Sequence, residues 1–278
     1  MKISVITINR NNAAGLKKTI DSVVRQTERP FEFIIIDGAS TDDSVAVLRA
    51  HEAGIDFWVS EPDAGIYNAM NKGIANAHGD WCIFMNSGDS FSSPTVLEKL
   101  RLSGANADII CGNTIVLEDP PKRRIPPAEI TLDFLFNHTI CHQSALIRLN
   151  LLLKHPYDES LRIVADRKFF LQSLILDNCS YQAVDIDIAD YDLTGLSSLN
   201  SLACEQEYAR VLEELFPLRI RLDYGRKKLG SLYGDSPYNK LFAEIGRRNW
   251  RKPIYRLVRR ALLCLSPFIK SARFVREF

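Results

Sequence analysis

The sequence lacks several features that mark other classes of protein. Its six cysteines are widely spaced and form no CxxC pair, which argues against a zinc site or a disulfide scaffold and predicts a reducing, cytoplasmic setting. No run of about 18 uninterrupted apolar residues occurs, so a membrane-spanning helix is not expected. The first ten residues, MKISVITINR, are too short and polar for a signal peptide, and export is not predicted.

A glycine fingerprint for dinucleotides is also missing. The first predicted strand is followed by a turn without GxGxxG, and the nearest glycine, Gly15, already lies inside the next predicted helix. A dehydrogenase with a classical dinucleotide-binding fold is therefore disfavoured.

Charge is present but unevenly distributed. The net charge of the 278 residues is +1, yet residues 247–278 carry ten Lys and Arg side chains against one acid. We call residues 247–278 the basic tail. Apolar residues recur at helical spacing within 251–273 while Lys252, Arg256, Arg259 and Arg260 occupy another face. This pattern predicts an amphipathic helix on the inner face of the cytoplasmic membrane; the alternative is a helix packed on the rest of the chain. Nucleic-acid binding is not expected, because no reading motif accompanies the charge.

Short apolar runs alternate with amphipathic stretches in the N-terminal half, which predicts an α/β fold with a mainly parallel sheet flanked by helices. Strands are predicted at 3–8, 31–36, 57–60 and 81–85, with helices at 14–26, 40–50 and 66–77. Further along we expect extended segments at 108–117, 140–147 and 182–189, a loop at 119–127, and helices within 162–176, 201–216 and 218–230.

Polar clusters follow the ends of the first four predicted strands. They are Thr7-Ile8-Asn9-Arg10, Asp37-Gly38-Ala39-Ser40, Glu61-Pro62-Asp63 and Asn86-Ser87-Gly88-Asp89. In an open parallel sheet, ligands bind beyond the carboxyl ends of the strands. We therefore expect these clusters to form one site.

The order and spacing of these motifs resemble family 2 glycosyltransferases. The resemblance is carried by ISVITINRNNAAGLKKTIDSVVRQT, FEFIIIDGASTDDSVAVL and SEPDAGIYNAMNKGIANAHGDWCIFMNSGDSF, and later by ICHQSALIRLNLLLKHPYDESLRIVADRKFFL and TGLSSL. It implies a GT-A (Rossmann-like) domain over residues 1–200. Residues 201–278 are then a C-terminal helical extension that includes the basic tail.

The resemblance also implies a reaction. A hexosyl residue would move from a nucleotide sugar, with UDP favoured, to a polyprenyl-diphosphate-linked or saccharide acceptor, in one step with inversion. The similarity is to bacterial O-antigen and exopolysaccharide enzymes, which implies a role in lipopolysaccharide or related surface polysaccharide synthesis.

On the donor side, the resemblance implies that Asp37 accepts a hydrogen bond from the nucleotide base. Thr7 and Asn9 would shape the same pocket, and Asp63 would line it. A uracil ring presents an N–H between two carbonyls, so a fixed carboxylate suits it. The structural alternatives are a turn residue at Asp37 and a helix cap at Asp63.

Asp89 would bind a divalent cation, Mg²⁺ or Mn²⁺, together with the donor diphosphate, because hard oxygen ligands suit these ions. The family's paired-carboxylate DxD is Ser87-Gly88-Asp89 here, with one acid in place of two. Ser87 cannot supply a carboxylate's charge, so most of the affinity for metal would come from the donor. The alternative is a plain turn.

Asp166 is the implied general base, at the start of a predicted helix, and would take the proton of the acceptor hydroxyl. His142 and Gln143 resemble the family's acceptor-side pair and would hydrogen-bond the acceptor. The structural alternatives are an N-cap at Asp166 and a structural role for His142.

Two other functions remain open from the sequence. A sugar-phosphate nucleotidyltransferase shares the general architecture, but it needs a glycine-rich basic loop where Asn9-Arg10-Asn11-Asn12 stands. A catalytically inactive nucleotide-sugar-binding or membrane scaffold protein is favoured by the single acid of Ser87-Gly88-Asp89 and disfavoured by the intact Asp166.

Overall fold

The structure, a computed structural model, describes residues 1–29, 32–192 and 201–223. The chain forms two compact units, Met1–Pro217 and Leu218–Phe278, and of the second unit residues 218–223 are described and helical. The basic tail and its predicted amphipathic helix lie outside the described residues. Within the described ranges, no helix is both long and apolar enough to cross a membrane.

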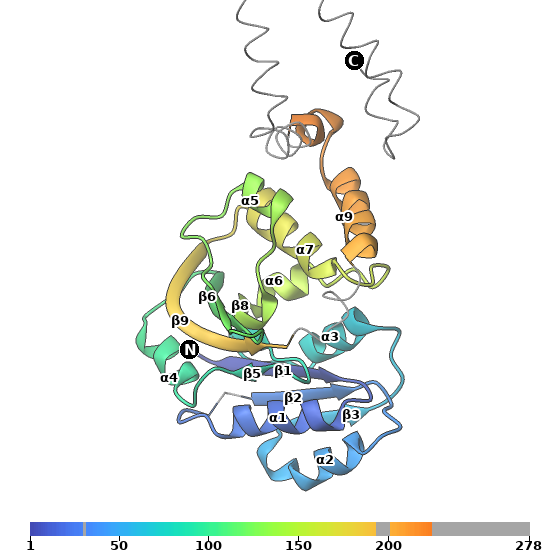
Figure 1. Cartoon of the computed structure of the whole chain (residues 1–278), viewed down its shortest axis with the longest axis vertical. Helices are drawn as coiled ribbons and strands as arrows, with labels where there is room; N and C mark the ends of the chain where they lie inside the picture. Colours follow the sequence, from blue (N-terminus) through green and yellow to red (C-terminus); the bar gives the residue numbers. More distant parts are fainter. Residues whose placement is uncertain (30–31, 193–200, 224–278) are drawn as a thin grey trace, which may run out of the picture. The chain divides into compact units, whose positions relative to one another are not determined.

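One mixed sheet runs through the first unit (Figure 1). Its strands are β1 Ile3–Asn9, β2 Glu32–Asp37, β3 Phe57–Ser60, β4 Trp81–Phe84, β5 Ser90–Phe91, β6 Ile109–Val116, β7 Lys122–Arg124, β8 Ala145–Arg148 and β9 Tyr181–Tyr191. They are ordered β3-β2-β1-β4-β8-β6-β9-β5, with β7 paired to β6.

Helices cover both faces of the sheet. The α-helices in the described part of the first unit are α1 Ala13–Val24, α2 Ser44–Ala50, α3 Ile66–Ala75, α4 Val96–Leu102, α5 Leu132–Asn137, α6 Leu149–Lys154, α7 Ala165–Phe170 and α9 Ser201–Leu215. Shorter turns are the 3₁₀ helices η1 Glu52–Gly54 and η2 His142–Ser144, and the π-helix η3 Leu171–Leu176. The predicted α/β class with helices flanking the sheet is confirmed.

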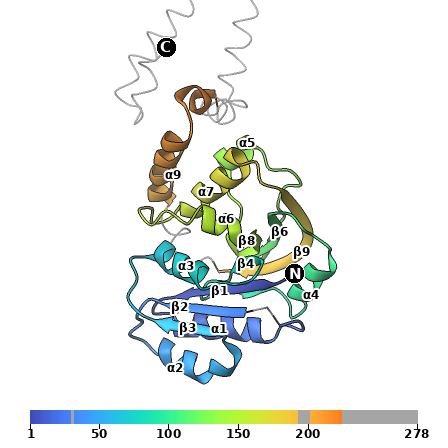
Figure 2. The same ribbon diagram turned by 180° about the vertical axis from the view of Figure 1, so that it is seen from behind.

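Strands β3, β2, β1 and β4 are parallel, as their β-branched apolar runs predict. The chain adds β2 and β3 on one side of β1 and then returns to place β4 on the other side. Right-handed crossovers therefore put α1 and α2 on one face and α3 on the opposite face, as Figures 1 and 2 show. The boundary between β1 and β4 is the point at which the strand order reverses, and such points bind ligands in open α/β sheets.

Successive side chains of β1 and β2 point to opposite faces of the sheet, which explains why helices pack on both faces. Val5 and Ile35 belong to the core cluster that includes Leu16 and Ile20 of α1. On the other face, α3 approaches so closely that a Cβ on Gly73 would lie 2.4 Å from a methyl group of Ile6. Both faces are buried, so the strands read as continuous apolar runs.

Beyond β4 the sheet changes direction. Strand β8 is antiparallel to β4 and to β6, and β6 is parallel to β9. The amino end of β8 therefore lies at the same edge of the sheet as the carboxyl ends of β1, β4, β6 and β9. This reversal brings residues that precede β8 next to residues that follow β1 and β4.

Several boundaries differ from the sequence prediction in this second half. The segment 140–147 was expected to be extended, but η2 occupies its middle and β8 begins only at Ala145. The predicted strand 182–189 extends to Tyr181–Tyr191, and the loop 119–127 contains the short strand β7. Apolar spacing alone cannot distinguish a strand from a strand preceded by one tight turn.

Candidate active site

The candidate site lies at the edge where β1 and β4 end and β8 begins. The clusters predicted from the strand ends do come together there. They form two groups of polar side chains, one around Asp37 and one around Asp89 and Asp166.

Asp37 ends β2 and is completely buried. Its Oδ1 accepts from Asn9 Nδ2 at 2.7 Å and from the Ser40 hydroxyl at 2.5 Å. Its Oδ2 accepts from the Ser40 amide at 3.0 Å and the Ser60 hydroxyl at 2.6 Å. Burial opposes the charge, but these hydrogen bonds outweigh it and hold the pKa of Asp37 below its usual value.

This arrangement orients Asn9. A carboxylate only accepts hydrogen bonds, so the amide nitrogen of Asn9 must face Asp37. The amide oxygen then points away from it, and this oxygen is buried without a protein partner. Asn9 therefore offers an acceptor atom beside Asp37, as a group that binds a ligand's N–H would.

Asp63 lies over the turn that follows β2. A Cβ on Gly38 would lie 2.2 Å from Asp63 Oδ2, so only glycine fits beneath this carboxylate. Asp63 Oδ1 accepts from the amide of Gly65 at 2.9 Å and lies 3.9 Å from the guanidinium of Arg10. The structure thus places Asp63 beside the Asp37 group.

Thr7 lies within β1 and is fully buried. Its hydroxyl donates to the carbonyl of Met85 at 2.7 Å. This hydrogen bond joins β1 to the residue that follows β4, so Thr7 helps to hold together the two strands at whose ends the site lies. Its predicted part in shaping a nucleotide pocket stays a prediction.

Asp89 follows β4 and is 5 % exposed. Its Oδ1 accepts from the amide of Asp192 at 3.0 Å, and its Oδ2 accepts from Gln143 Nε2 at 3.1 Å. The Gln143 amide is oriented by the thiol of Cys141, which donates to Oε1 and whose pKa burial raises to about 11. Burial also raises the pKa of Asp89, because its two hydrogen bonds do not offset the loss of water.

The backbone around Ser87 and Gly88 is held by α1. Asn12 Nδ2 donates to the Ser87 carbonyl at 3.2 Å, and Lys18 Nζ donates to the Gly88 carbonyl at 2.7 Å. Gly88 has φ +107°, which favours glycine, and a Cβ there would lie 3.9 Å from a carboxylate oxygen of Asp192. A second acid therefore lies beside Asp89, although Ser87 supplies none.

These residues fit a divalent cation in part. The described residues contain no group of three or more His, Cys, Asp and Glu side chains that would hold a metal by themselves. Asp89 is, however, a buried carboxylate whose negative charge is disfavoured by its loss of water. The carboxylate of Asp192 lies close to the neighbouring Gly88. Such a donor set suits a cation whose remaining ligands come from a bound phosphate.

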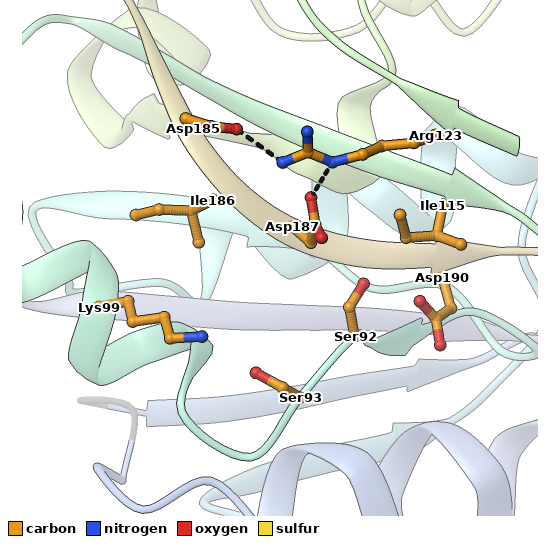
Figure 3. A pocket seen from close by; sticks show the side chains of 9 residues that line it. All are labelled: Ser92, Ser93, Lys99, Ile115, Arg123, Asp185, Ile186, Asp187 and Asp190. Carbon is orange, nitrogen blue, oxygen red and sulfur yellow. Dashed lines mark hydrogen bonds and ion pairs between the residues drawn. The ribbon is translucent and has the colours of Figure 1, made fainter.

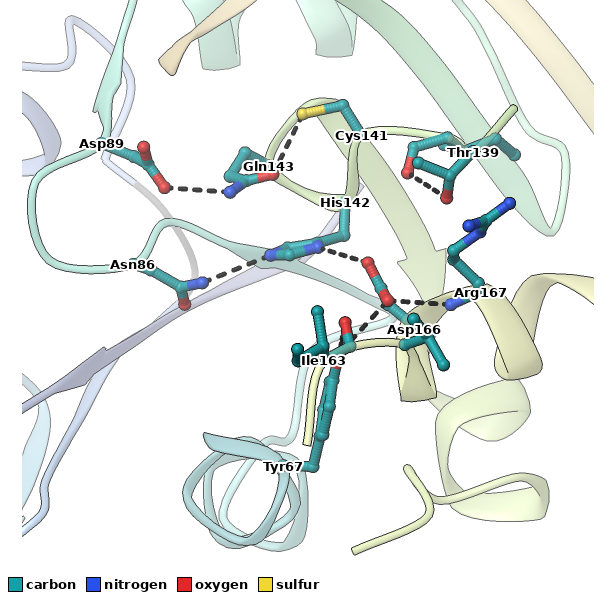
Figure 4. A network of polar contacts seen from close by, with 12 residues as sticks. Tyr67, Asn86, Asp89, Thr139, Cys141, His142, Gln143, Ile163, Asp166 and Arg167 are labelled. Atoms are coloured by element: carbon teal, nitrogen blue, oxygen red, sulfur yellow. Dashed lines mark hydrogen bonds and ion pairs between the residues drawn. The ribbon is translucent and has the colours of Figure 1, made fainter. Parts of the chain in front are cut away.

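The second group is built around Asp166, at the start of α7 and 9 % exposed (Figure 4). His142 Nδ1 lies 3.0 Å from Asp166 Oδ2, and His142 Nε2 lies 3.2 Å from Asn86 Nδ2. The amide nitrogen of Asn86 can only donate, so Nε2 accepts and the ring's proton sits on Nδ1. His142 thus donates to Asp166 and orients its carboxylate.

Three residues that meet at the site were not predicted from the sequence. The hydroxyl of Tyr67 lies 2.7 Å from the carbonyl of Ile163 and 3.2 Å from Asp166 Oδ1 (Figure 4). Asn86 was placed in a polar cluster without a role, and Asp192 was not singled out. Each lies far along the chain from its partner, so no local pattern marks it.

A separate pocket of about 360 Å³ lies along β9, where Arg123 bridges Asp185 and Asp187 at 2.6 Å (Figure 3). None of the predicted site residues lines it. The two groups described above are therefore the stronger candidate for chemistry.

Comparison with known proteins identifies the family to which the chain is similar. Residues 4–158 match the family model Glycosyl transferase family 2. The chain is 36 % identical over 241 residues to the uncharacterized glycosyltransferase Rv1514c of Mycobacterium tuberculosis, covering 83 % of this chain and 89 % of that protein. It is 29 % identical over 227 residues to the PGL/p-HBAD biosynthesis glycosyltransferase Rv2957 of the same species, covering 79 % and 87 %.

Solved structures share the fold at low identity. S. aureus TarS 1–349 in complex with UDP-GlcNAc has a TM-score of 0.62 and 16 % identity, covering 86 % of this chain and 74 % of that one. Glucosyl-3-phosphoglycerate synthase of Mycobacterium tuberculosis, with Mn²⁺, UDP-glucose and phosphoglyceric acid, has a TM-score of 0.55 and 18 % identity, covering 76 % and 79 %. Both likenesses support the predicted GT-A fold.

The hydrogen bonds of Asp37 lead to a prediction for stability. In Asp37→Asn one acceptor oxygen becomes a donor that faces other donors, so we expect the free energy of unfolding to fall by about 2 to 4 kcal/mol at pH 7. Because the pKa of Asp37 is lowered by folding, its contribution is complete above the unfolded-state pKa of about 3.9 and is lost as pH falls through the lower folded-state value. The difference between wild type and variant should therefore narrow below about pH 4.

Urea denaturation at a series of pH values measures this difference. Asp43→Asn is the matched control, because Asp43 is exposed and makes no side-chain cap. A difference that does not depend on pH, or an equal loss in both variants, would contradict the assignment.

Proposed function

The chain belongs to glycosyl transferase family 2, and from this premise we propose its donor, its acceptor and the residues that carry the reaction. It is a glycosyltransferase that uses a nucleotide sugar. We propose that it transfers a hexosyl residue from a UDP-sugar to a hydroxyl of a lipid-linked or saccharide acceptor. The observation that carries the proposal is the pair of buried carboxylates Asp89 and Asp166, which are hydrogen-bonded to neighbouring residues of η2.

The donor nucleotide would bind at the Asp37 group. Two similar structures carry uridine nucleotides, UDP-GlcNAc in one and UDP-glucose in the other, which favours UDP. Asp37 and the free amide oxygen of Asn9 provide acceptors for the imide N–H of uracil, and the Ser40 hydroxyl can rotate to release a lone pair. Asp63, held beside Arg10, would face the same nucleotide.

The cation would be Mg²⁺ or Mn²⁺, and Mn²⁺ accompanies the nucleotide sugar in a similar structure. Asp89 would hold it, with Asp192 beside it and Ser87 contributing only its hydroxyl or carbonyl. When bound, the cation neutralises negative charge on the nucleoside diphosphate. Gln143 keeps the Asp89 carboxylate in place.

Asp166 would act as the general base. The acceptor oxygen forms a bond to the anomeric carbon, the bond from that carbon to the diphosphate oxygen breaks, and the acceptor's proton passes to Asp166. One displacement inverts the anomeric configuration. His142 fixes the direction of the Asp166 carboxylate, and it would also hydrogen-bond the acceptor.

The role in bacterial surface polysaccharide synthesis, as in O-antigen or exopolysaccharide assembly, is proposed from the family resemblance. One relative is named a PGL/p-HBAD biosynthesis glycosyltransferase; for this chain we propose a lipid-linked acceptor. The basic tail would bring the protein to the anionic inner surface of the cytoplasmic membrane, next to such an acceptor.

The nucleotidyltransferase alternative receives no support, since the family match covers more than half of the chain. An inactive scaffold was favoured by the single acid of Ser87-Gly88-Asp89. The position of Asp192 weakens that case, because it returns a second carboxylate to the site.

The metal assignment predicts how nucleotide binding responds to Mn²⁺. Calorimetry with UDP, GDP, CDP and dTDP should show that UDP binds most tightly. Mn²⁺ should increase the affinity of the protein for UDP. Asp89→Asn should reduce UDP affinity in Mn²⁺ by at least the roughly 10- to 100-fold that loss of an outer-shell partner causes. Asp190→Asn, on β9 and facing the separate pocket, is the control and should bind as wild type does. If Mn²⁺ increases the UDP affinity of Asp89→Asn as much as that of wild type, Asp89 is not a ligand of the cation.

The base assignment predicts a loss of turnover without a loss of donor binding. Turnover is measured as UDP release from UDP-glucose, UDP-galactose and UDP-GlcNAc, with alkyl glycosides as acceptors and with water alone as the background reaction. Asp166→Asn should bind UDP normally and lower kcat by roughly 100-fold or more. Glu159→Gln, at a nearby exposed acid that contacts Asn68 and Asn71, should keep kcat. Normal turnover in Asp166→Asn would exclude it as the base.

The membrane proposal is tested with the full chain and sedimented vesicles. Binding to vesicles rich in phosphatidylglycerol should exceed binding to phosphatidylcholine and weaken in high salt. Replacing Arg256, Arg259 and Arg260 by Gln should lower the partition coefficient about 100-fold, at about 1 kcal/mol for each charge. The same number of exposed charges removed from Lys17, Arg25 and Arg29 is the control. If the partition coefficient falls equally in both triple variants, binding reflects general charge attraction, and the basic tail is not a specific membrane-binding segment.

A further inference from the structure

The segment 162–164, which leads into α7 and Asp166, is held from two sides by residues with no assigned role. We propose that Tyr67 of α3 and Glu207 of α9 are positioning residues that fix this segment and with it the Asp166 carboxylate. The inference rests on the proposed role of Asp166 as the base.

Glu207 holds the segment through its amides. Its side chain is 5 % exposed, and Oε1 accepts from the Arg162 amide at 2.8 Å. Oε2 accepts from the amides of Ile163 and Val164 at 2.7 and 3.1 Å. These N–H groups precede α7, whose own N-cap residue makes no side-chain hydrogen bond. The carboxylate of a distant helix thus fixes the backbone immediately before α7.

Further contacts seat α9 against α7 on the side of Asp166. The guanidinium of Arg167 lies 3.3 Å from the ring centroid of Tyr208. Lys168 Nζ lies 2.6 Å from a carboxylate oxygen of Glu214. These two residues of α9, which follow Glu207 in the chain, therefore hold α9 against the helix that carries Asp166.

Tyr67 holds the same segment through a carbonyl. Its hydroxyl lies 2.7 Å from the oxygen of Ile163 and 3.2 Å from Asp166 Oδ1. Burial, and then the charge of Asp166, raises the pKa of Tyr67 well above its ordinary value. The hydroxyl therefore keeps its proton and acts only as a hydrogen-bond donor and acceptor.

The single hydroxyl proton of Tyr67 cannot be donated to the Ile163 carbonyl and to Asp166 at the same time. The hydroxyl therefore has two possible hydrogen-bond arrangements. When Asp166 is ionised, the tyrosine can donate to Oδ1. When Asp166 has taken the acceptor's proton, the new O–H can donate to the tyrosine oxygen, while the tyrosine donates to Ile163. A hydrogen bond to Asp166 is thus available before and after proton transfer, and the segment need not move between the two states.

The test uses kcat and donor binding together. Tyr67→Phe and Glu207→Gln in the full chain should each lower kcat about 10- to 100-fold, the effect of a small misplacement of a catalytic group. The affinity for UDP with Mn²⁺, measured by calorimetry, should stay within about twofold of wild type, since neither side chain is hydrogen-bonded to Asp37 or to Asp89.

Each variant has a matched control. Tyr157→Phe removes another buried hydroxyl, one without a hydrogen-bond partner, from a ring 5.5 Å from that of Tyr67. Glu205→Gln changes an exposed acid on α9. Both controls should keep wild-type kcat, and thermal melting of all four variants shows that they are folded.

A double-mutant series separates positioning from general damage. Because Tyr67 acts through Asp166, adding Tyr67→Phe to Asp166→Asn should cause no further loss of kcat. Additive losses, unchanged kcat in Tyr67→Phe, or an equal loss in Tyr157→Phe would overturn the inference. If Glu207→Gln does not fold, the Tyr67 series decides the result.

The outcomes also distinguish this inference from the proposed function. Normal turnover in Asp166→Asn removes the base itself. If Asp166→Asn loses turnover while Tyr67→Phe and Glu207→Gln keep it, the role of Asp166 as the base stands. Only the positioning roles of Tyr67 and Glu207 are then rejected.

Discussion

A carboxylate is costly to remove from water unless donors replace its hydration, and this constraint shapes the whole site. Asp37, Asp166 and Glu207 are buried and satisfied by amides, hydroxyls and one imidazole. Their donors come from segments that are distant in sequence, so each carboxylate ties several elements together. Asp89 differs, because two donors leave its charge unfavourable. The one incompletely compensated acid is also the one assigned to a cation.

The direction of the strands places these acids within reach of one another. The parallel strands β1, β2 and β4 bring Asn9, Asp37 and Asn86 to one edge of the sheet. The antiparallel strand β8 then brings His142 and Gln143 to the same edge from the opposite direction. A fully parallel sheet would carry the start of β8 to the far edge, away from Asp89.

The first half of the fold and the donor side of the site could be predicted from sequence because their signals are local. Apolar runs of β-branched residues and polar clusters at their ends mark β1 to β4 and the positions of Asp37 and Asp89. Local patterns could not reveal contacts across the chain. Tyr67 reaches Asp166 over 99 residues, and the Asp192 amide reaches Asp89 over 103. The start of β8 was also misplaced, because the three polar residues of the 3₁₀ turn His142–Ser144 lie between apolar residues, and the pattern predicts one strand across them. The roles of the site residues stay predictions, since geometry alone shows only that they meet.

The clamp of Glu207 on the segment before Asp166 has a consequence for synthesis of the protein. A ribosome releases Asp37 first, and Asp166 and the helix α9, which carries Glu207, emerge more than a hundred residues later. A nascent chain can therefore complete its first parallel strands long before α9 exists. The segment before Asp166 can therefore acquire its three hydrogen bonds from Glu207 only when the first unit is almost fully translated.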